Sequence, residues 1–352
     1  MASHHESRGT QGEYPVFVSL GMIVLDEIRF ASSHTLYDVP GGSGLYATFG
    51  SRLFETGMRS ARVGCVVLAG CDFPENLLRR LQSWGITLAV HEMSGKPSTR
   101  GLLEYEDDAF GRKSFTYVNP PLQPLPAHIE HCDLLWSRSF HFLAPPEDLE
   151  VQLGALLGLR EQHGITERPM IVWEPAPYGC DFVNLACHLR ACALVDVFSP
   201  NHLELGYLVD GKLAKDPEFS KSAVELSARK FLDSGVGNGK PGIVVIRCGE
   251  HGVLTMSSLG AEWLPPYYDR LCSKVVDPTG VGNAFLGGFT VSLLETHDPR
   301  EASIRGSVAS SYALEQFSVP SLAPDSWLSK ETWNESSVLR RVEEFNGRLS
   351  KV

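Results

Sequence analysis

The segment Val275–Gly288 (VVDPTGVGNAFLGG) combines residue types that bind phosphate. A short strand is expected to end at Asp277, and a turn containing proline and glycine leads into an apolar helical pattern that begins near Gly282. The first backbone N–H groups of a helix have no acceptor within it, and they carry the positive end of its dipole. The amides of 280–282 are therefore expected to hold an anion, which Gly280 and Gly282 admit because they lack Cβ. A plain strand–turn–helix corner is the alternative.

A second candidate is Asp26, which ends the apolar run Tyr14–Asp26 (YPVFVSLGMIVLD). The run is rich in β-branched residues and almost continuous, which is typical of a strand buried on both faces of a sheet. Open α/β sheets bind their ligands at the carboxyl ends of the strands, so Asp26 is placed to contact a ligand. An acidic residue that simply ends a strand is the alternative.

The elements that must position these residues alternate between strands and helices. Expected strands cover 61–69, 134–143, 170–174, 195–198, 242–248 and 252–257, and expected helices cover 41–53, 74–84, 146–163, 182–194, 201–209, 220–232, 281–296, 300–316 and 337–349. This order predicts an α/β fold with a doubly wound, mostly parallel sheet. The alternating stretch Gly101–Val118 predicts a hairpin, which we expect to form a small β lid together with the polar, irregular stretch Glu27–Pro40. The lid segments would span about 27–40 and 97–120 of a domain covering 14–352, after a disordered tail over 1–13.

The composition narrows the class of protein. The chain has 352 residues and a formal net charge of −11, with 43% hydrophobic and 21% charged residues. Nucleic-acid and membrane-surface proteins need a basic face, so neither partner is expected. No apolar run reaches the length of a membrane span, and the polar start is not a secretory signal. Eight dispersed cysteines without a C-x-x-C pair favour reduced thiols in a cytoplasmic protein, with a zinc site at Cys187, His188 and Cys192 as the alternative.

The segment 275–288 resembles the second signature of the PfkB (ribokinase-like) carbohydrate and nucleoside kinases, D-T-x-G-A-G-D-x-F-x-G-G. Other features of that family occur in the family's order. They are the opening strand Val18–Asp26, the di-glycine Gly41-Gly42, the N-x-x-E motif from Asn201 to Glu204, and the strand and turn Val244–Gly252. The D-P-T-G-x-G-N variant is most similar to the fungal maintenance-of-killer branch of PfkB-domain proteins.

The resemblance implies an ATP-dependent kinase that phosphorylates a hydroxyl of a small metabolite of the sugar or nucleoside class. The γ-phosphate would lie over Gly280–Gly282, and Glu204 with Asn201 would order water bound to Mg²⁺, a cation that prefers oxygen ligands. A capped helix start is the alternative for that pair. The implied catalytic residues are Asp277, Gly280, Gly282 and Asn283; the substrate-binding residues are Asp26, Gly41, Gly42 and Tyr46; the nucleotide-binding residues are Asn201, Glu204, Arg247, Gly249, Gly252, Thr279 and Val281; and Glu204 is the metal residue. The protein would act as a monomer or homodimer.

Two residues depart from the family pattern. Tyr46 stands where the family's G-G-x-x-x-N motif has asparagine, which predicts a more aromatic pocket and favours a nucleoside over a simple sugar. Asn283 stands where the signature has its catalytic aspartate, and an amide cannot hold a proton at neutral pH. Loss of a general base typically slows a reaction by about 10²- to 10⁴-fold. Asp277 could take over this role, or the substrate hydroxyl could be more acidic; the alternative is a pseudokinase that binds nucleotide or a partner without turnover.

Overall fold

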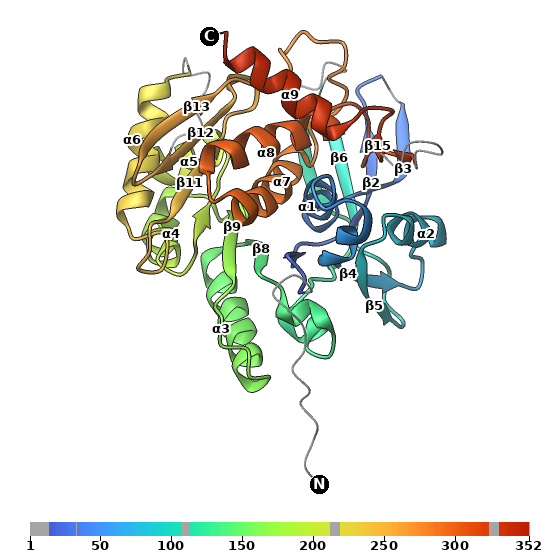
Figure 1. The fold of residues 1–352 in the computed structure, drawn as a ribbon. Coiled ribbons are helices and arrows are strands. Elements are labelled where there is room, and N and C mark those ends of the chain that lie inside the picture. The colour runs from blue at the N-terminus through green and yellow to red at the C-terminus, as the bar shows by residue number, and fades with distance from the viewer. Residues whose placement is uncertain (1–13, 33, 107–112, 212–218, 324–330, 352) are drawn as a thin grey trace.

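A computed structural model describes residues 14–32, 34–106, 113–211, 219–323 and 331–351 of the chain. Its centre is a nine-stranded sheet in the order β13-β12-β11-β10-β9-β8-β1-β4-β5 (Figure 1). The strands are β1 (Phe17–Ser19), β4 (Val63–Gly70), β5 (Thr87–Met93), β8 (Ser139–Ala144), β9 (Met170–Pro175), β10 (Val197–Phe198), β11 (Ile243–Arg247), β12 (Val253–Ser257) and β13 (Gly260–Leu264). Strand β12 is antiparallel to both of its neighbours, β11 and β13, and all the other pairs of this sheet are parallel. The predicted doubly wound, mostly parallel sheet is confirmed.

Helices cover both faces of this sheet. One group comprises α1 (Ser43–Arg52), α2 (Glu75–Ser83), α7 (Val281–Thr296), α8 (Pro299–Ala313) and α9 (Val338–Leu349); the other comprises α3 (Pro146–Gln162), α4 (Leu185–Cys192), α5 (His202–Asp210) and α6 (Lys221–Asp233). Alternate residues of one strand serve the two faces: Val172 packs with the first group, whereas Ile171 and Trp173 pack with the second. Each face therefore has its own hydrophobic core, as the period of two along a strand requires.

A smaller sheet lies beside the first, with the strand order β3-β2-β6-β7. Its strands are β2 (Val24–Arg29), β3 (Thr35–Gly41), β6 (Arg100–Tyr105) and β7 (Lys113–Tyr117). The two segments expected to form a lid therefore share one sheet, and its small core includes Ile28 and Leu103. A further two-stranded pair, β14 (Leu322–Ala323) and β15 (Thr332–Trp333), lies near it (Figure 1).

Three sequence-based expectations about strands are wrong. The run Tyr14–Asp26 is divided between β1 in the large sheet and β2 in the small one, so Asp26 lies within a lid strand and does not end a core strand. Glu27–Pro40 is correspondingly not irregular, because β2 and β3 occupy most of it. Asp277 does not end a strand either. The backbone N–H groups of Val276 and Asp277 both donate to the carbonyl of Leu314, just after α8, so this segment is tied to a helix end.

Other elements were missed or lie outside the described residues. Both β5 and β13 are absent from the sequence-based expectation, because each is partly exposed at an edge of the sheet and alternates weakly. The tail over 1–13, predicted to be disordered, lies outside the described residues. No helix in the part of the chain that the structure describes combines the length and the apolarity needed to span a bilayer.

Candidate active site

The N-terminus of α7 is built to receive an anion. Gly280 precedes the helix in the left-handed conformation at φ 73°, and the first helical hydrogen bond runs from Ala284 N to Gly280 O over 2.9 Å. The amides of 281–283 have no acceptor among the described residues. A Cβ on Gly282 would lie 1.9 Å from Nη1 of Arg247, so only glycine leaves room here for that guanidinium. A cation and the positive end of a helix therefore meet at one point, as in anion sites.

Asp277 lies at the same corner, and its two carboxylate oxygens differ. Oδ1 accepts hydrogen bonds from Thr279 N at 2.9 Å, Thr279 Oγ1 at 2.7 Å and Tyr105 Oη at 2.8 Å. Oδ2 is buried and has no hydrogen-bond partner among the described residues. Because a buried carboxylate oxygen without a donor is unfavourable, Oδ2 is available to a ligand hydroxyl.

Tyr105 also links the two sheets, because it lies on β6 of the small sheet and contacts Asp277 next to α7. The hairpin expected from 101–118 therefore lies on the same side of the molecule as the N-terminus of α7. Burial and the neighbouring charge of Asp277 both raise the pKa of Tyr105, so its hydroxyl remains a donor.

Asp26 lies on β2 between two glycines of the neighbouring strands. A Cβ on Gly41 of β3 would lie 2.4 Å from Asp26 Oδ2, and a Cβ on Gly101 of β6 would lie 2.3 Å from Oδ1. The two glycines leave the space that this carboxylate occupies. Gly42 follows at φ 92° and begins α1, so the di-glycine is the link between the small sheet and the main body.

Tyr46 on α1 lies directly beneath the phosphate-binding corner. It is 2% exposed, and a Cβ on Gly280 would lie 2.0 Å from its ring. Burial raises the pKa of its phenol, and the charges of Asp277 and Asp26 raise it further. Tyr46 therefore stays neutral, and its ring lies against Gly280 with the charges of Asp277 and Asp26 both nearby.

Asn283 makes its contact inside the protein. Its Nδ2 donates to Oε2 of Glu174, which lies on β9, and Oε1 of Glu174 is 2.8 Å from Nη1 of Arg247. Nε2 of His141 on β8 lies 3.4 Å from Glu174 Oε2. The other ring nitrogen of His141 bonds Ser19 Oγ, at the end of β1, over 2.9 Å. A buried polar chain therefore crosses three neighbouring strands, at the point where the strand order reverses, and ends at α7.

Glu174 is ionised although it is 6% exposed. Burial opposes the charged form, but the charge of Arg247 and the contact with His141 outweigh it and lower the pKa of this carboxyl group. Arg247 also donates from Nη2 to the carbonyl of Ser199 at 2.9 Å. The guanidinium is thus fixed from two sides.

Asn201 and Glu204 form a capping box at the start of α5. Asn201 Oδ1 accepts from Leu203 N and Glu204 N at 2.9 Å each, and Glu204 Oε2 accepts from Asn201 N at 2.7 Å. The helix-capping alternative is therefore what these contacts show. Burial raises the pKa of Glu204 to about 7, with Arg247 opposing and Glu174 adding to the shift. No cluster of three or more metal-binding side chains occurs within the described ranges.

Gly249 and Gly252 flank a short turn between β11 and β12. Both have positive φ, 56° and 90°, and a Cβ on Gly252 would lie 2.0 Å from the carbonyl oxygen of Leu264. The turn therefore requires glycine for its own geometry. Asn201 pairs with Arg247 in an isolated bridge, which places the start of α5 beside the end of β11.

Sequence reasoning missed Glu174, His141 and Tyr105. Glu174 had a readable signal, since it ends the predicted strand 170–174, and strand ends of a parallel sheet bind ligands. His141 and Tyr105 lie inside apolar or alternating runs and gave no signal. Their contacts join residues 33 and 172 positions apart, which no local pattern reveals.

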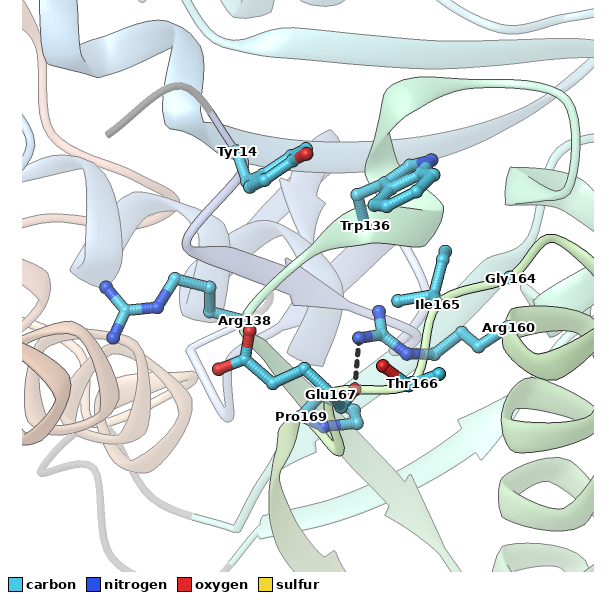
Figure 2. A pocket seen from close by; sticks show the side chains of 9 residues that line it. All are labelled: Tyr14, Trp136, Arg138, Arg160, Gly164, Ile165, Thr166, Glu167 and Pro169. Carbon is cyan, nitrogen blue, oxygen red and sulfur yellow. Dashed lines mark hydrogen bonds between the residues drawn. The ribbon is translucent and has the colours of Figure 1, made fainter. Parts of the chain in front are cut away.

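A cavity of about 220 Å³ lies elsewhere, near residues that precede β1, β8 and β9 (Figure 2). Arg160 lines it but donates to the carbonyls of Leu135, Ser137 and Glu167, so its guanidinium is already used by the backbone. This cavity is at the amino ends of the strands, away from α7. A second cavity, of about 350 Å³, lies between β3 and α2, where Arg80 lines it.

The cysteines support no metal centre. All eight are free, and Cys65, Cys180, Cys192 and Cys248 are buried. His188, from the possible zinc set, stacks on Trp173 with ring centroids 5.5 Å apart and contacts the carbonyl of Asn184 at 2.9 Å. It is a core histidine.

The large, mostly parallel sheet with helices on both faces and a small second sheet defines a ribokinase-like fold. The model of the pfkB family of carbohydrate kinases matches residues 32–325. The chain belongs to this family, as the sequence resemblance predicted.

Relatives and solved structures agree with that assignment. The chain is 28% identical over 342 residues to an uncharacterised protein of Schizosaccharomyces pombe, covering 94% of this chain and 92% of the relative. It is 28% identical to protein MAK32 of Saccharomyces cerevisiae, covering 92% and 90%. A cytidine kinase of Thermococcus kodakarensis is 26% identical, covering 77% and 86%.

Two solved structures share the fold. Ribokinase of Giardia lamblia matches with a TM-score of 0.67 at 16% identity, over 96% of this chain and 99% of that one. A putative ribokinase II of E. coli in complex with ATP and Mg²⁺ matches with a TM-score of 0.64 at 17% identity, over 95% and 99%.

Proposed function

We propose that this protein transfers the γ-phosphate of ATP to a hydroxyl of a small metabolite of the sugar or nucleoside class. The observation that carries the proposal is the corner at α7, where open backbone amides, Gly280, Gly282 and Arg247 converge. No Cβ fits at either glycine, because the ring of Tyr46 lies against Gly280 and Nη1 of Arg247 lies against Gly282, and the lack of a side chain leaves the backbone amides of this corner accessible to a phosphate group. The similarity to a cytidine kinase and to a ribokinase-like protein bound to ATP and Mg²⁺ supports the same function.

The acceptor binds between the two sheets in this proposal. Asp26, flanked by Gly41 and Gly101, holds a hydroxyl of the acceptor, and Tyr46 forms the wall beneath it. Oδ2 of Asp277 accepts the proton of the attacking hydroxyl, because that oxygen is buried without a hydrogen-bond partner among the described residues. The acceptor oxygen forms its bond to the γ-phosphorus, the bond from that phosphorus to the bridging oxygen breaks, and ADP leaves with the electron pair.

Most of the rate enhancement comes from positioning and charge neutralisation. The amides of 281–283 and the guanidinium of Arg247 neutralise charge on the transferred group. Glu204 would hold Mg²⁺ through water, and the cation would supply further neutralisation of phosphate charge. Gly41 and Gly42 let the small sheet close over the site and exclude water.

The test is ADP formation by the purified protein with ATP, Mg²⁺ and pooled sugars, nucleosides and vitamins. We expect ADP release that depends on one acceptor pool and is lost in Asp277→Asn. Stabilisation by ATP and Mg²⁺ without ADP release from any pool would favour the pseudokinase that Asn283 suggests. Neither stabilisation nor ADP release at millimolar nucleotide would refute both functions.

A further inference from the structure

Glu174 is the buried charge on which the polar groups in front of α7 converge. Its carboxylate contacts Asn283 from α7, Arg247 from β11 and His141 from β8, three elements that meet only in the folded chain. It is an anion at the end of a core strand, beside the N-terminus of a helix. The kinase signature covers position 283, where this chain has asparagine in place of aspartate, but it does not include residue 174.

The contact with Glu174 fixes the side-chain amide of Asn283. Because Nδ2 donates to Oε2 of Glu174, Oδ1 of the same amide must point the other way. A carboxylate accepts only, so the opposite orientation of the amide would place two oxygens in contact. Glu174 thus decides which atom of Asn283 a ligand meets.

Glu174 also holds Arg247 in a place that would otherwise be unfavourable. Nη1 of Arg247 lies against Gly282, at the positive end of α7, where the helix dipole repels a cation. The ion pair of 2.8 Å with Glu174 compensates that repulsion. Nη2 of Arg247 donates to the carbonyl of Ser199 and lies 3.7 Å from Oε2 of Glu204, so Nη1, which Glu174 holds, is the nitrogen that lies at the N-terminus of α7.

We propose that Glu174 is the positioning residue of this site, holding Arg247 against the N-terminus of α7 and Asn283 in one orientation. The inference rests on the proposed phosphotransferase function. Asn283 is then one half of a carboxylate–amide pair in which the carboxylate comes from β9. An aspartate at 283 would place two carboxylates in contact, so the asparagine follows from Glu174.

The test measures the affinity for ATP with Mg²⁺ by calorimetry in four proteins. These are the wild type, Glu174→Gln, the exchange variant Glu174→Gln/Asn283→Asp, and Glu343→Gln as a control on the exposed face of α9. Glu174→Gln removes the charge and lets the amide of residue 174 present either atom. We expect binding about 10- to 100-fold weaker, the loss typical of a hydrogen bond to a charged group. The exchange variant restores one carboxylate and one amide and should recover most of the affinity, and the control should match the wild type.

Other results would overturn the inference. Unchanged binding in Glu174→Gln would show a purely structural role, and tighter binding would show that Glu174 competes with phosphate. If Glu174→Gln weakens ATP binding and the exchange variant does not restore the affinity, the loss comes from disturbed packing. In these three cases the proposed function stands, since the wild type binds; failure of the wild type itself to bind would overturn both. If Glu174→Gln does not fold, Glu174→Asp is measured with the same expectation, because it withdraws the charge by one methylene. If the wild type phosphorylates an acceptor, Glu174→Gln should lower kcat by a larger factor than it raises KM for that acceptor.

Discussion

Replacing Asn283 by aspartate should destabilise the protein, although it recreates the residue of the kinase signature. The amide of Asn283 donates to Glu174, and an aspartate would lose that donor and bring a second carboxylate into contact with the first. Two unit charges about 4 Å apart repel by roughly 4 kcal/mol at an effective dielectric constant of about 20. Arg247, 2.8 Å from Glu174, offsets part of this, so we expect a net loss of about 2 kcal/mol.

The loss should depend on pH in a definite direction. Repulsion raises the pKa of the introduced carboxyl group in the folded protein above its unfolded value of about 4. A raised folded pKa leaves stability intact at low pH, where the proton is bound, and removes stability as pH rises through the raised value. Arg247 and His141, which also face this pair, are present in every variant and cancel in the comparison.

The assay is thermal unfolding of the wild type, Asn283→Asp and Asn283→Ala at about pH 5.5 and about pH 8. A loss of about 2 kcal/mol corresponds to roughly 3–5 °C in a chain of this size. The deficit of Asn283→Asp should be larger at the higher pH, whereas that of Asn283→Ala should be equal at both. Adding Glu174→Gln to Asn283→Asp should remove the pH dependence. A deficit that is the same at both pH values would refute the contact between residues 174 and 283.

Three further outcomes are expected. Gly282→Val should abolish stabilisation by ATP with Mg²⁺, because a Cβ would lie 1.9 Å from Arg247, whereas Gly154→Val, with nothing within 4 Å, should retain it. Tyr105→Phe should lower stability by about 1–2 kcal/mol and speed hydrogen exchange in β6, because Asp277 loses one buried donor. Glu204→Gln in metal-free buffer should raise the melting temperature at about pH 8 but not at about pH 5. Burial raises the pKa of Glu204 in the folded protein to about 7, so the stability of the wild type falls as pH rises toward that value. Equal effects of Glu204→Gln at both pH values would contradict this expectation.

Local sequence patterns predicted most of the helices and strands of the fold. Helix α7 begins at Val281 and ends at Thr296, as its apolar pattern predicted, since glycines mark its start and the apolar run its length. The hairpin at 101–118 was likewise readable from strict alternation around a polar turn. The division of Tyr14–Asp26 between two sheets was not, because every residue in the run is compatible with a buried strand. Only the pairing of β2 with β3 and β6, a tertiary fact, separates the two halves.

The residues of the candidate site likewise fall into those that a local sequence pattern indicated and those that depend on tertiary contacts. Gly280, Gly282 and Asp277 could be proposed from the sequence because the corner at the start of α7 is local, with all its parts within a few residues. Glu174 and Tyr105 were not found, since each acts through a partner more than a hundred positions away. Tyr46 was identified as a departure from the family pattern, but its contact with Gly280 depends on how α1 packs on α7.

The buried ion pair of Glu174 and Arg247 is relevant to whether Asn283 indicates an enzyme that has lost its activity. Taking two charges out of water costs free energy that an apolar pair of similar volume would avoid, so folding alone does not explain why the pair lies here. Its place does: the guanidinium faces the open amides of α7, and the carboxylate fixes the residue that departs from the signature. A chain that had merely lost its catalytic aspartate would have no need of a compensating charge on another strand. We infer that residues 174, 247 and 283 form one unit that faces an anionic ligand at the N-terminus of α7.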